Sequence, residues 1–306
     1  MTKTKELHKE IISKFNILRN ESLVLHTNIR IGGIADYLSV VDDQDKFVEL
    51  YHICRDENIR FLVLGHGTNV FFADEGFRGI VIVINFNKIN LVDETTVRVE
   101  SGAALSELNR FCIANCLTGF EFSSGIPGTV GGAIYGNAGA YGKNIGECLH
   151  SATVLTADGT VKKVTKDFFK FAYRHSALKE NNGIVLEADL KFEKGDYDDI
   201  LHKVREIRGI RFKKLPNWGI STAGSYFKNL KDEQGNPVAA AVYLDAVDSK
   251  HTTVGDAGVH IKHANIFYNK GHASARDVLE LEKILRERVL EKFNIRLQRE
   301  VMYIKS

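Results

Sequence analysis

GFEFSSGIPGTVGGAIYGNAGAYG, residues 119–142, is the stretch around which the 306-residue chain is organised. Eight of its 24 residues are glycine, a spacing that disfavours both a stable helix and a regular strand interior. Flexible linkers of this glycine content are rich in polar residues, whereas this stretch contains the apolar Ile126, Val130 and Ile134. The sequence therefore predicts a buried, shaped loop whose bare backbone lets another group approach closely.

A phosphate is the usual partner of such a loop, because backbone N–H groups without side chains around them can bind its oxygens. The alternative is a tight crossing of two strands with no ligand. A second glycine loop, Gly65-His66-Gly67-Thr68-Asn69, follows the apolar run 61–64. It is not the Rossmann fingerprint, which needs a third glycine and a helix behind it. Two glycine loops in one chain favour the two phosphates of a dinucleotide cofactor.

The composition is that of an ordinary soluble globular protein, with 44% apolar and 26% charged residues, and the length allows two domains. The net charge of +2 gives no reason to expect nucleic acid or an anionic membrane as a partner. No apolar run reaches the roughly 18 residues of a membrane span, and the charged N-terminal segment lacks a signal-peptide core, so we expect a cytoplasmic protein. The four cysteines show no CxxC spacing, which favours free thiols over zinc, and we expect no metal site.

Apolar periodicity predicts helices and strands along the whole chain. The expected helices cover residues 5–16, 43–57, 106–116, 197–211 and a long segment from 274. The expected strands cover 37–41, 61–64, 80–84, 186–192 and 296–304, and residues 157–160 mark a hairpin between two more. The alternation over 186–192 is typical of a half-exposed strand, and Ser274 with Asp277 fits a helix capping box. KLPNWGIST at 214–222 indicates a turn between domains.

Taken singly, the polar residues that could carry chemistry have ordinary structural explanations. His260 and His263 form an i, i+3 pair with no third ligand nearby, which favours exposed turn histidines over a metal site. Ser225 lies in AGSYF rather than the GxSxG of a nucleophile elbow, so a turn or cap role is favoured. Arg174 in an aromatic setting suits a surface stem packed on a ring, and Glu300 suits a strand-edge charge.

Seven segments, in order, resemble the UDP-N-acetylenolpyruvoylglucosamine reductases (UDP-N-acetylmuramate dehydrogenases) of bacterial cell-wall synthesis. They are TNIRIGG at 27–33, LGHGTN at 64–69, the whole of 119–142, YRHS at 173–176, AGSYFKN at 223–229, KHANIFYN at 262–269 and LQREV at 297–301. GIPGTVGGA followed by NAGAYG is the most specific of these matches. The short path from YRHS to AGSYFKN is similar to the shorter subtype of the family, which lacks a substrate-capping insertion.

The resemblance implies an α+β fold in two domains. The first, residues 1–213, would be an FAD-binding domain of the vanillyl-alcohol-oxidase type, built from two α+β subdomains that divide near residue 79. The second, residues 214–306, would be a third α+β unit that binds the substrate. FAD would be held from the backbone of both glycine loops. The implied cofactor residues are Gly65, His66, Gly67, Thr68, Asn69, Gly125, Ile126, Pro127, Gly128, Thr129 and Gly132.

The implied reaction passes hydride from NADPH to the flavin and on to the β-carbon of the enolpyruvyl ether of UDP-N-acetylglucosamine-enolpyruvate. Arg174 would pair with the substrate carboxylate and stabilise the enolate that forms. Ser225 would donate a proton to the α-carbon, and Glu300 would orient or polarise the enolate. Asn229 would bind substrate, and Lys214 would meet its diphosphate. The substrate and NADPH are the only partners expected of what we take to be a monomer.

Departures from the family pattern leave two alternatives open. Leu230 stands where the family usually has Pro, residues 239–250 lack the usual glycines, and His260 and Ile261 replace small or polar residues. These changes affect the shape of the substrate pocket rather than the chemistry residues. One alternative is a flavin oxidase of the same fold acting on another substrate. The other is a flavin- or nucleotide-binding paralogue without turnover.

Overall fold

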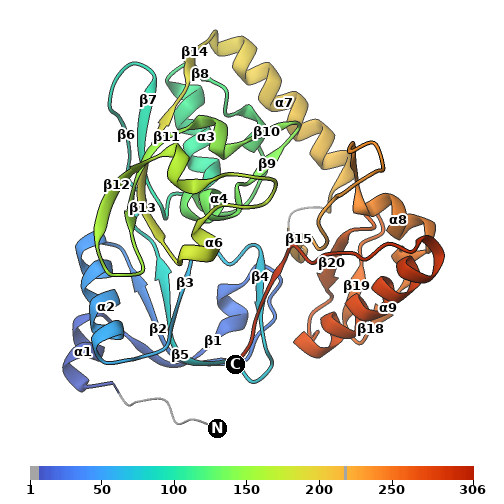
Figure 1. The fold of residues 1–306 in the computed structure, drawn as a ribbon, viewed down its shortest axis with the longest axis horizontal. Coiled ribbons are helices and arrows are strands. Elements are labelled where there is room, and N and C mark those ends of the chain that lie inside the picture. The colour runs from blue at the N-terminus through green and yellow to red at the C-terminus, as the bar shows by residue number, and fades with distance from the viewer. Residues whose placement is uncertain (1–6, 217–218) are drawn as a thin grey trace.

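The computed structural model describes residues 7–216 and 219–306. Three sheets of four or five strands form its framework, and α7 (Tyr197–Lys214) leads from the part that contains the first two sheets to the part that contains the third (Figure 1). The first two residues of the helix expected at 5–16, and Asn217 and Trp218 of the expected interdomain turn, lie outside the described residues. Within the described ranges, no helix is both long enough and apolar enough to cross a membrane.

The first sheet has the order β1-β2-β5-β3. Its strands and flanking helices are β1 (Leu18–Ser22), β2 (Ile34–Val41), β3 (Phe61–Leu64), β5 (Phe77–Ile84), α1 (Lys9–Lys14) and α2 (Gln44–Asp56). β5 is paired in parallel on both sides, so its apolar residues are buried almost throughout, which explains the continuous run IVIVI. Phe47 and Leu50 of α2 join Ile80 and Ile82 of β5 in one core. Residue 79, near which the subdomain boundary was expected, lies within β5, and the pairing of β5 with β2 continues to Ile84.

The second sheet is antiparallel, in the order β12-β11-β13-β7-β6. Its elements are β6 (Ile89–Leu91), β7 (Thr96–Glu100), β11 (Leu149–Leu155), β12 (Val161–Thr165), β13 (Ile184–Lys191), α3 (Leu105–Ala114) and α4 (Val130–Gly136). The hairpin expected at residues 157–160 joins β11 to β12 and is confirmed. Apolar side chains of α3 and α4 pack on those of β7 and β13, so these helices cover one face of the sheet.

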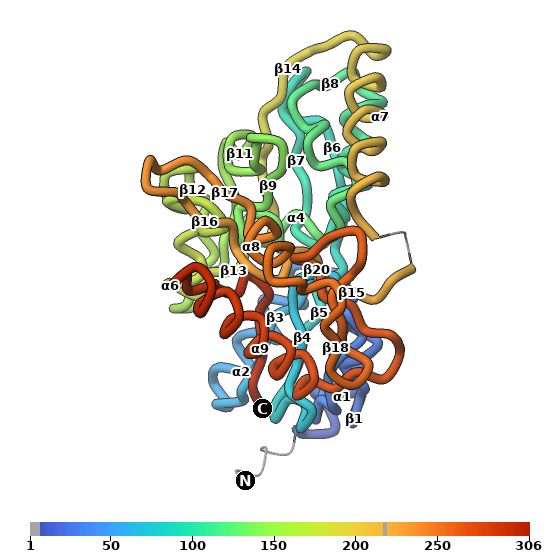
Figure 2. The backbone as a smooth tube through the Cα atoms, turned by 90° about the vertical axis from the view of Figure 1, so that its right-hand side faces the viewer, coloured from blue at the N-terminus to red at the C-terminus, as the bar shows by residue number. Residues whose placement is uncertain are grey.

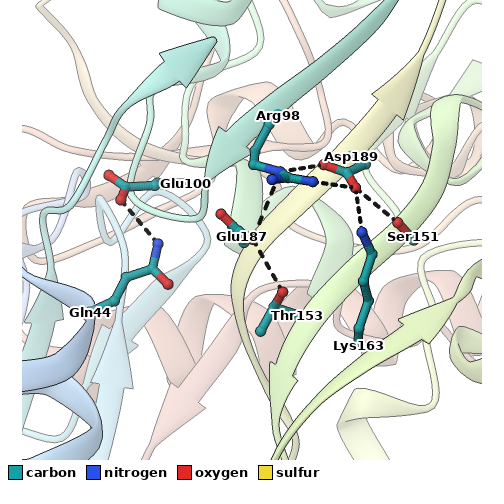
Figure 3. Close-up of polar contacts among 8 residues, drawn as sticks. All are labelled: Gln44, Arg98, Glu100, Ser151, Thr153, Lys163, Glu187 and Asp189. Carbon is teal, nitrogen blue, oxygen red and sulfur yellow. Dashed lines mark hydrogen bonds and ion pairs between the residues drawn. The ribbon is translucent and has the colours of Figure 1, made fainter. Parts of the chain in front are cut away.

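The opposite face of this sheet carries paired charges (Figure 3). The Asp189 carboxylate accepts hydrogen bonds from Arg98 at 2.8 and 3.1 Å, from Lys163 at 2.9 Å and from Ser151 at 3.1 Å. Asp189 is 7% exposed, so β13 is more deeply buried than its alternating pattern predicted. The reason is that Asp189, a polar position of the alternating pattern, is covered by its ion-pair partners Arg98 and Lys163.

The third sheet has the order β15-β20-β19-β18 and packs against two helices. The elements are β15 (Ser221–Ser225), β18 (Thr253–Val254), β19 (Ala257–Val259), β20 (Ile266–Asn269), α8 (Ala240–Ala246) and α9 (Ala275–Phe293). The capping box expected at the start of α9 is confirmed: Asp277 N–H donates to Ser274 Oγ at 3.1 Å and Ser274 N–H donates to Asp277 Oδ2 at 2.9 Å. Val278 and Leu285 of α9 are fully buried in this core.

The remaining elements are short. They are β4 (Val70–Phe72), β8 (Leu117–Thr118), β9 (Gly139–Ala140), β10 (Lys143–Asn144), β14 (Glu193–Lys194), β16 (Leu230–Lys231), β17 (Pro237–Val238), β21 (Met302–Ile304), α5 (Ile145–Cys148) and α6 (Leu178–Asn181). β21 covers only the end of the strand expected at 296–304.

The third sheet and its helices are fastened to the first subdomain at several points. Figure 2 shows these orange and red elements facing the viewer, in front of the first two sheets. β21 returns from them and pairs in parallel with β4 (Figure 1). The Asp74 carboxylate accepts from the N–H groups of Ala275 at 2.6 Å and Arg276 at 3.1 Å, and so caps α9 from outside its own domain. This return of the chain brings the segment before β21 beside the first glycine loop.

The central glycine stretch contains a helix, and the expectation that its glycines exclude one is wrong. α4 buries Val130, Ala133 and Ile134 against the second sheet, and this packing offsets the poor helix propensity of glycine. A Cβ atom on Gly131 would lie 2.8 Å from Cβ of Ser101. Glycine in this helix therefore permits a close approach of the backbone to the strand end beside it.

Candidate active site

The two glycine loops expected to bind phosphate lie against each other. A Cβ atom on Gly65 would lie 2.5 Å from Thr129 Oγ1, and one on Gly128 would lie 3.1 Å from Thr68 Oγ1. Gly128 also has φ +128°, a backbone conformation that side chains rarely allow. Residues 65–69 and 125–132, which the sequence separates widely, therefore form one cradle, and we call it the glycine cradle.

Backbone donors of the glycine cradle are free. Within the described part of the chain, no N–H group of residues 65–69 donates a hydrogen bond, and the same holds for Gly125, Gly128 and Thr129. Gly131 packs against the Cβ atom of Ser101, whose buried hydroxyl has no described partner either. A concentration of unbonded N–H groups is the backbone arrangement that binds phosphate oxygens, so these residues fit the pyrophosphate of FAD.

Three of the expected cofactor residues shape the glycine cradle rather than offer it donors. Ile126 N–H donates to Ser123 O at 2.8 Å, Gly132 N–H donates to Thr129 Oγ1 at 3.3 Å, and Pro127 has no N–H. His66 is exposed, but partial desolvation of its ring lowers the pKa of the imidazole, although Glu107 opposes this effect. The lowered pKa favours the neutral ring.

Arg174 and Glu300 form an ion pair beside the glycine cradle. Arg174 Nε donates to Glu300 Oε1 at 2.6 Å, and Arg174 Nη1 donates to the carbonyl oxygen of Gly139 at 3.0 Å. Gly139 belongs to the glycine-rich stretch. The backbone of Arg174 has φ +54°, in the left-handed region that costs a non-glycine residue about 1–3 kcal/mol. Surrounding contacts therefore hold this arginine in a strained, defined position.

Glu300 lies between the glycine cradle and Ser225. Its carbonyl oxygen accepts from Asn69 Nδ2 at 3.4 Å, and its N–H donates to the carbonyl oxygen of Tyr226 at 2.8 Å. Its side chain is 15% exposed. Burial raises the pKa of the Glu300 carboxyl, and the opposing charge of Arg174 does not cancel that effect. A carboxyl with a raised pKa exchanges protons more readily near neutral pH than a surface carboxyl does.

Ser225 is the last residue of β15 and is half-buried. Among the described residues its hydroxyl has no hydrogen-bond partner, so it is available to a bound molecule. Lys228, three residues on, is close enough to influence the charge of Glu300. The structure thus brings Arg174, Ser225 and Glu300 into one region.

The two expected substrate residues differ in their placement. Asn229 lies beside the Arg174 segment, because its N–H donates to the Tyr173 hydroxyl at 3.2 Å, and its Oδ1 accepts from Ala240 N–H at 3.2 Å. Lys214 ends α7 and is exposed, with no contact to Arg174 or Glu300 among the described residues. The arrangement therefore joins Asn229, but not Lys214, to the ion pair.

Sequence reasoning missed two basic residues of this region. Lys179 Nζ donates to the carbonyl oxygen of Arg174 at 2.8 Å. Burial, with help from the charges of Lys228 and Arg174, lowers the pKa of the Lys179 ammonium, while Glu300 opposes this. Arg211 Nη2 donates to the carbonyl oxygen of Gly125 at 3.0 Å and so supports the glycine cradle. Lys179 follows YRHS closely, which is a weak signal, and Arg211 is indistinguishable by sequence from its basic neighbours on α7.

Metal ligands do not gather in the described ranges: no group of three or more His, Cys, Asp and Glu side chains could hold an ion there. The four cysteines are free thiols, three of them buried.

Comparison with known proteins agrees with this geometry. Residues 35–165 match the family model described as an FAD binding domain. The α+β fold and the glycine cradle accordingly define an FAD-binding flavoprotein. Residues 216–304 match a second model, described as the C-terminal domain of UDP-N-acetylenolpyruvoylglucosamine reductase.

Relatives match along almost the whole chain. The UDP-N-acetylenolpyruvoylglucosamine reductase of Clostridium novyi is 37% identical over 97% of this chain and 94% of its own length. That of Enterococcus faecalis is 37% identical over 96% of each chain. The crystal structure of the enzyme from Thermus caldophilus superposes with a TM-score of 0.77 at 28% identity, covering 94% of this chain and 98% of that one. The chain belongs to the UDP-N-acetylenolpyruvoylglucosamine reductase family.

Proposed function

We propose that this protein is an FAD-containing, NADPH-dependent reductase that converts the enolpyruvyl ether of UDP-N-acetylglucosamine-enolpyruvate to UDP-N-acetylmuramate, a peptidoglycan precursor. The observation that carries the proposal is the Arg174–Glu300 pair, held between the glycine cradle and the Ser225 strand. Relatives with this name over nearly the full chain support it. When bound, FAD supplies hydride transfer from NADPH to the substrate β-carbon.

Arg174 binds the substrate carboxylate in this proposal. Hydride addition to the β-carbon pushes electron density onto that carboxylate, so a guanidinium beside it stabilises the transition state more than the ground state. The hydrogen bond to Gly139 and the strained backbone fix the guanidinium before substrate arrives. Arg174 must then share its donors between Glu300 and the substrate, and its planar fork has enough N–H groups for both.

Ser225 donates the proton that the α-carbon takes up. A hydroxyl is a weak acid, and nearby positive charge, here from Lys228, favours its loss of a proton. Glu300 with a raised pKa can carry a proton and donate a hydrogen bond to the developing enolate, which avoids repulsion between two anions. Asn229 binds another part of the substrate, and Lys214 stays our proposal for the diphosphate.

The test is anaerobic and separates two half-reactions of the purified yellow holoenzyme. NADPH should bleach the flavin absorbance, and the enolpyruvyl substrate alone should restore it, with UDP-N-acetylmuramate as product. Fast recovery of colour in air, with no response to the substrate, would favour the oxidase alternative. Protein that is colourless, or that does not respond to NADPH, would favour the paralogue without turnover.

We also infer a monomer in the cytoplasm. Size-exclusion chromatography with light scattering tests whether the protein is a monomer. A dimer mass would contradict it. Cell fractionation with an antibody to the native protein tests the location, which a membrane-bound pool would contradict.

A further inference from the structure

Helix α9 carries a buried carboxylate that the proposed reaction does not use. Glu282 is 3% exposed and lies on the face that also buries Val278, Leu281 and Leu285. A carboxylate in such a place costs stability unless charged or hydrogen-bonding groups compensate it. The sequence pattern calls for an apolar residue at this position of the helix, so the carboxylate needs a specific reason.

Three groups compensate Glu282. The Tyr226 hydroxyl donates to Oε2 at 2.8 Å, and Arg299 Nε lies 2.8 Å from the same oxygen. Arg286, one turn further along α9, places Nε 3.1 Å from Oε1. Tyr226 is 1% exposed and stacks on Phe267 with 3.9 Å between ring centroids, and burial raises the pKa of its hydroxyl. The tyrosine therefore stays protonated and acts as a donor.

Two of these partners are chain neighbours of proposed catalytic residues. Tyr226 directly follows Ser225, and Arg299 directly precedes Glu300. The two segments are also paired through their backbones, since Glu300 N–H donates to the Tyr226 carbonyl oxygen at 2.8 Å. Phe227 and Arg299 form a β-bridge next to that bond.

Side chains from both segments reach the Glu282 carboxylate, Tyr226 from one and Arg299 from the other. The Tyr226 ring is fully buried, whereas its neighbour Ser225 is half-buried and its hydroxyl is free of protein partners among the described residues. The side chains of Arg299 and its neighbour Glu300 are 27% and 15% exposed, and Glu300 is paired with Arg174. One carboxylate thus holds both segments through Tyr226 and Arg299.

We infer that Glu282 is a positioning residue, which sets the distance and orientation of the Ser225 hydroxyl relative to the Glu300 carboxyl by anchoring their chain neighbours Tyr226 and Arg299. This inference rests on the proposed function, because it takes Ser225 and Glu300 as the groups that act on the substrate. It adds a residue of α9, remote from the glycine cradle in sequence, to the machinery of proton delivery.

The test compares half-reactions of holoenzyme variants. Glu282→Gln keeps the shape and removes the charge that holds Arg299. Flavin reduction by NADPH should be unchanged, while re-oxidation by the enolpyruvyl substrate should slow about 10²-fold, the scale expected when a reacting group is misplaced by about 1 Å. The solvent deuterium isotope effect on re-oxidation should rise, because proton delivery becomes more rate-limiting. Substrate affinity of the oxidised holoenzyme, titrated by the flavin absorbance change, should not move.

Three further variants keep the test decisive. Tyr226→Phe preserves the stacked ring and loses only the hydroxyl, so it folds even if Glu282→Gln does not. Its flavin reduction by NADPH should be unchanged, and its re-oxidation by the substrate should slow less than that of Glu282→Gln. Combining the two changes should add little to Glu282→Gln alone, because both break one network. Glu280→Gln on the exposed side of the same helix is the matched control and should behave as wild type.

Wild-type re-oxidation rates in both Glu282→Gln and Tyr226→Phe would overturn the inference. Equal slowing of both half-reactions would also overturn it, because that pattern belongs to a residue that only supports the fold. Failure of the proposed function looks different: there the wild-type holoenzyme itself is not re-oxidised by the substrate, or Ser225→Ala re-oxidises at the wild-type rate.

Discussion

Arg174 Nε lies 2.6 Å from Oε1 of Glu300, although 126 residues separate the two along the chain. The contact joins the segment between β12 and β13 of the second sheet to the segment before the C-terminal strand β21. Arg174 is fixed in turn to the glycine-rich stretch through Gly139, and Glu300 to the first glycine loop through Asn69. The pair therefore connects the glycine cradle to the C-terminal domain, and a substitution of either residue should change the environment of the other.

Substitutions of this pair should be non-additive in the substrate half-reaction. Arg174→Ala and Glu300→Ala remove groups that act on one developing charge, so the double variant should be little worse than the worse single one. Arg174→Lys keeps the charge but loses the planar fork and should remain well below wild type. Glu300→Gln keeps shape and a donor and should lose less than Glu300→Ala. Stopped-flow measurement of flavin re-oxidation checks all four, and strictly additive losses would show that the two residues act at separate places.

Glu300 should make stability depend on pH in a defined direction. Burial raises the pKa of its carboxyl, so the folded protein holds this proton more tightly than the unfolded chain does. The resulting cost is absent below the ordinary pKa of about 4.3 and grows as pH rises from there through the raised pKa. The free energy of unfolding of Glu300→Gln, relative to wild type, should therefore increase with pH across that window and level off above it. A difference that stays constant or falls with rising pH in urea titrations would contradict this.

Asp189 should make stability depend on pH in the opposite direction to Glu300. Its hydrogen bonds to Arg98, aided by those to Lys163, lower the pKa of the carboxyl to about 2. The stabilisation is full above the ordinary pKa of about 3.9 and is lost as pH falls through about 2. Asp189→Asn should be less stable than wild type at neutral pH, and the two should converge at the acid end. The variant Asp167→Asn, at an exposed position, serves as the control. If the difference in the free energy of unfolding between wild type and Asp189→Asn does not narrow as pH falls, this account of the charged sheet face is wrong.

The glycine cradle should lose its cofactor when its backbone is covered. Gly128→Val places a branched side chain at φ +128°, against Thr68 and over free N–H groups. We expect folded protein with little flavin, measured as the ratio of flavin to protein absorbance after purification. Gly209→Ala, on the exposed side of α7 with open space around it, is the control and should keep its flavin and gain about 1 kcal/mol of stability. Full flavin occupancy in Gly128→Val would mean that the cofactor binds elsewhere and not against the glycine cradle.

Local signals in the sequence sufficed for much of the fold. The hairpin at 157–160 and the Ser274 capping box depend on interactions among near neighbours, and the apolar run 61–64 has the length and composition of a short strand. The structure confirms all three. The glycine helix α4 could not be predicted, because its stability comes from packing of Val130, Ala133 and Ile134 on a distant sheet rather than from propensity. The burial of Asp189 was missed for the same reason, since its partners lie on other strands.

Local sequence patterns predicted the residues of the candidate site less well than they predicted the fold. Glycine spacing indicated the two loops, but nothing periodic marks a contact such as Arg174 to Glu300, and resemblance to the family supplied those residues. Lys179 and Glu282 escaped even that resemblance. Each depends on long-range contacts, of Lys179 with the Arg174 backbone and of Glu282 with Tyr226 and Arg299, which spacing along one helix does not reveal.

The half-reactions of Ser225→Ala test the central claim most directly. The hydroxyl is free of partners among the described residues, so its removal should leave folding and flavin content intact. Flavin reduction by NADPH should proceed at the wild-type rate, because that step needs no proton at the substrate α-carbon. Anaerobic re-oxidation by the enolpyruvyl substrate should slow by about 10²–10⁴-fold, the usual contribution of a general acid. Equal slowing of the two half-reactions, or wild-type re-oxidation, would contradict the assignment of Ser225 as the proton donor.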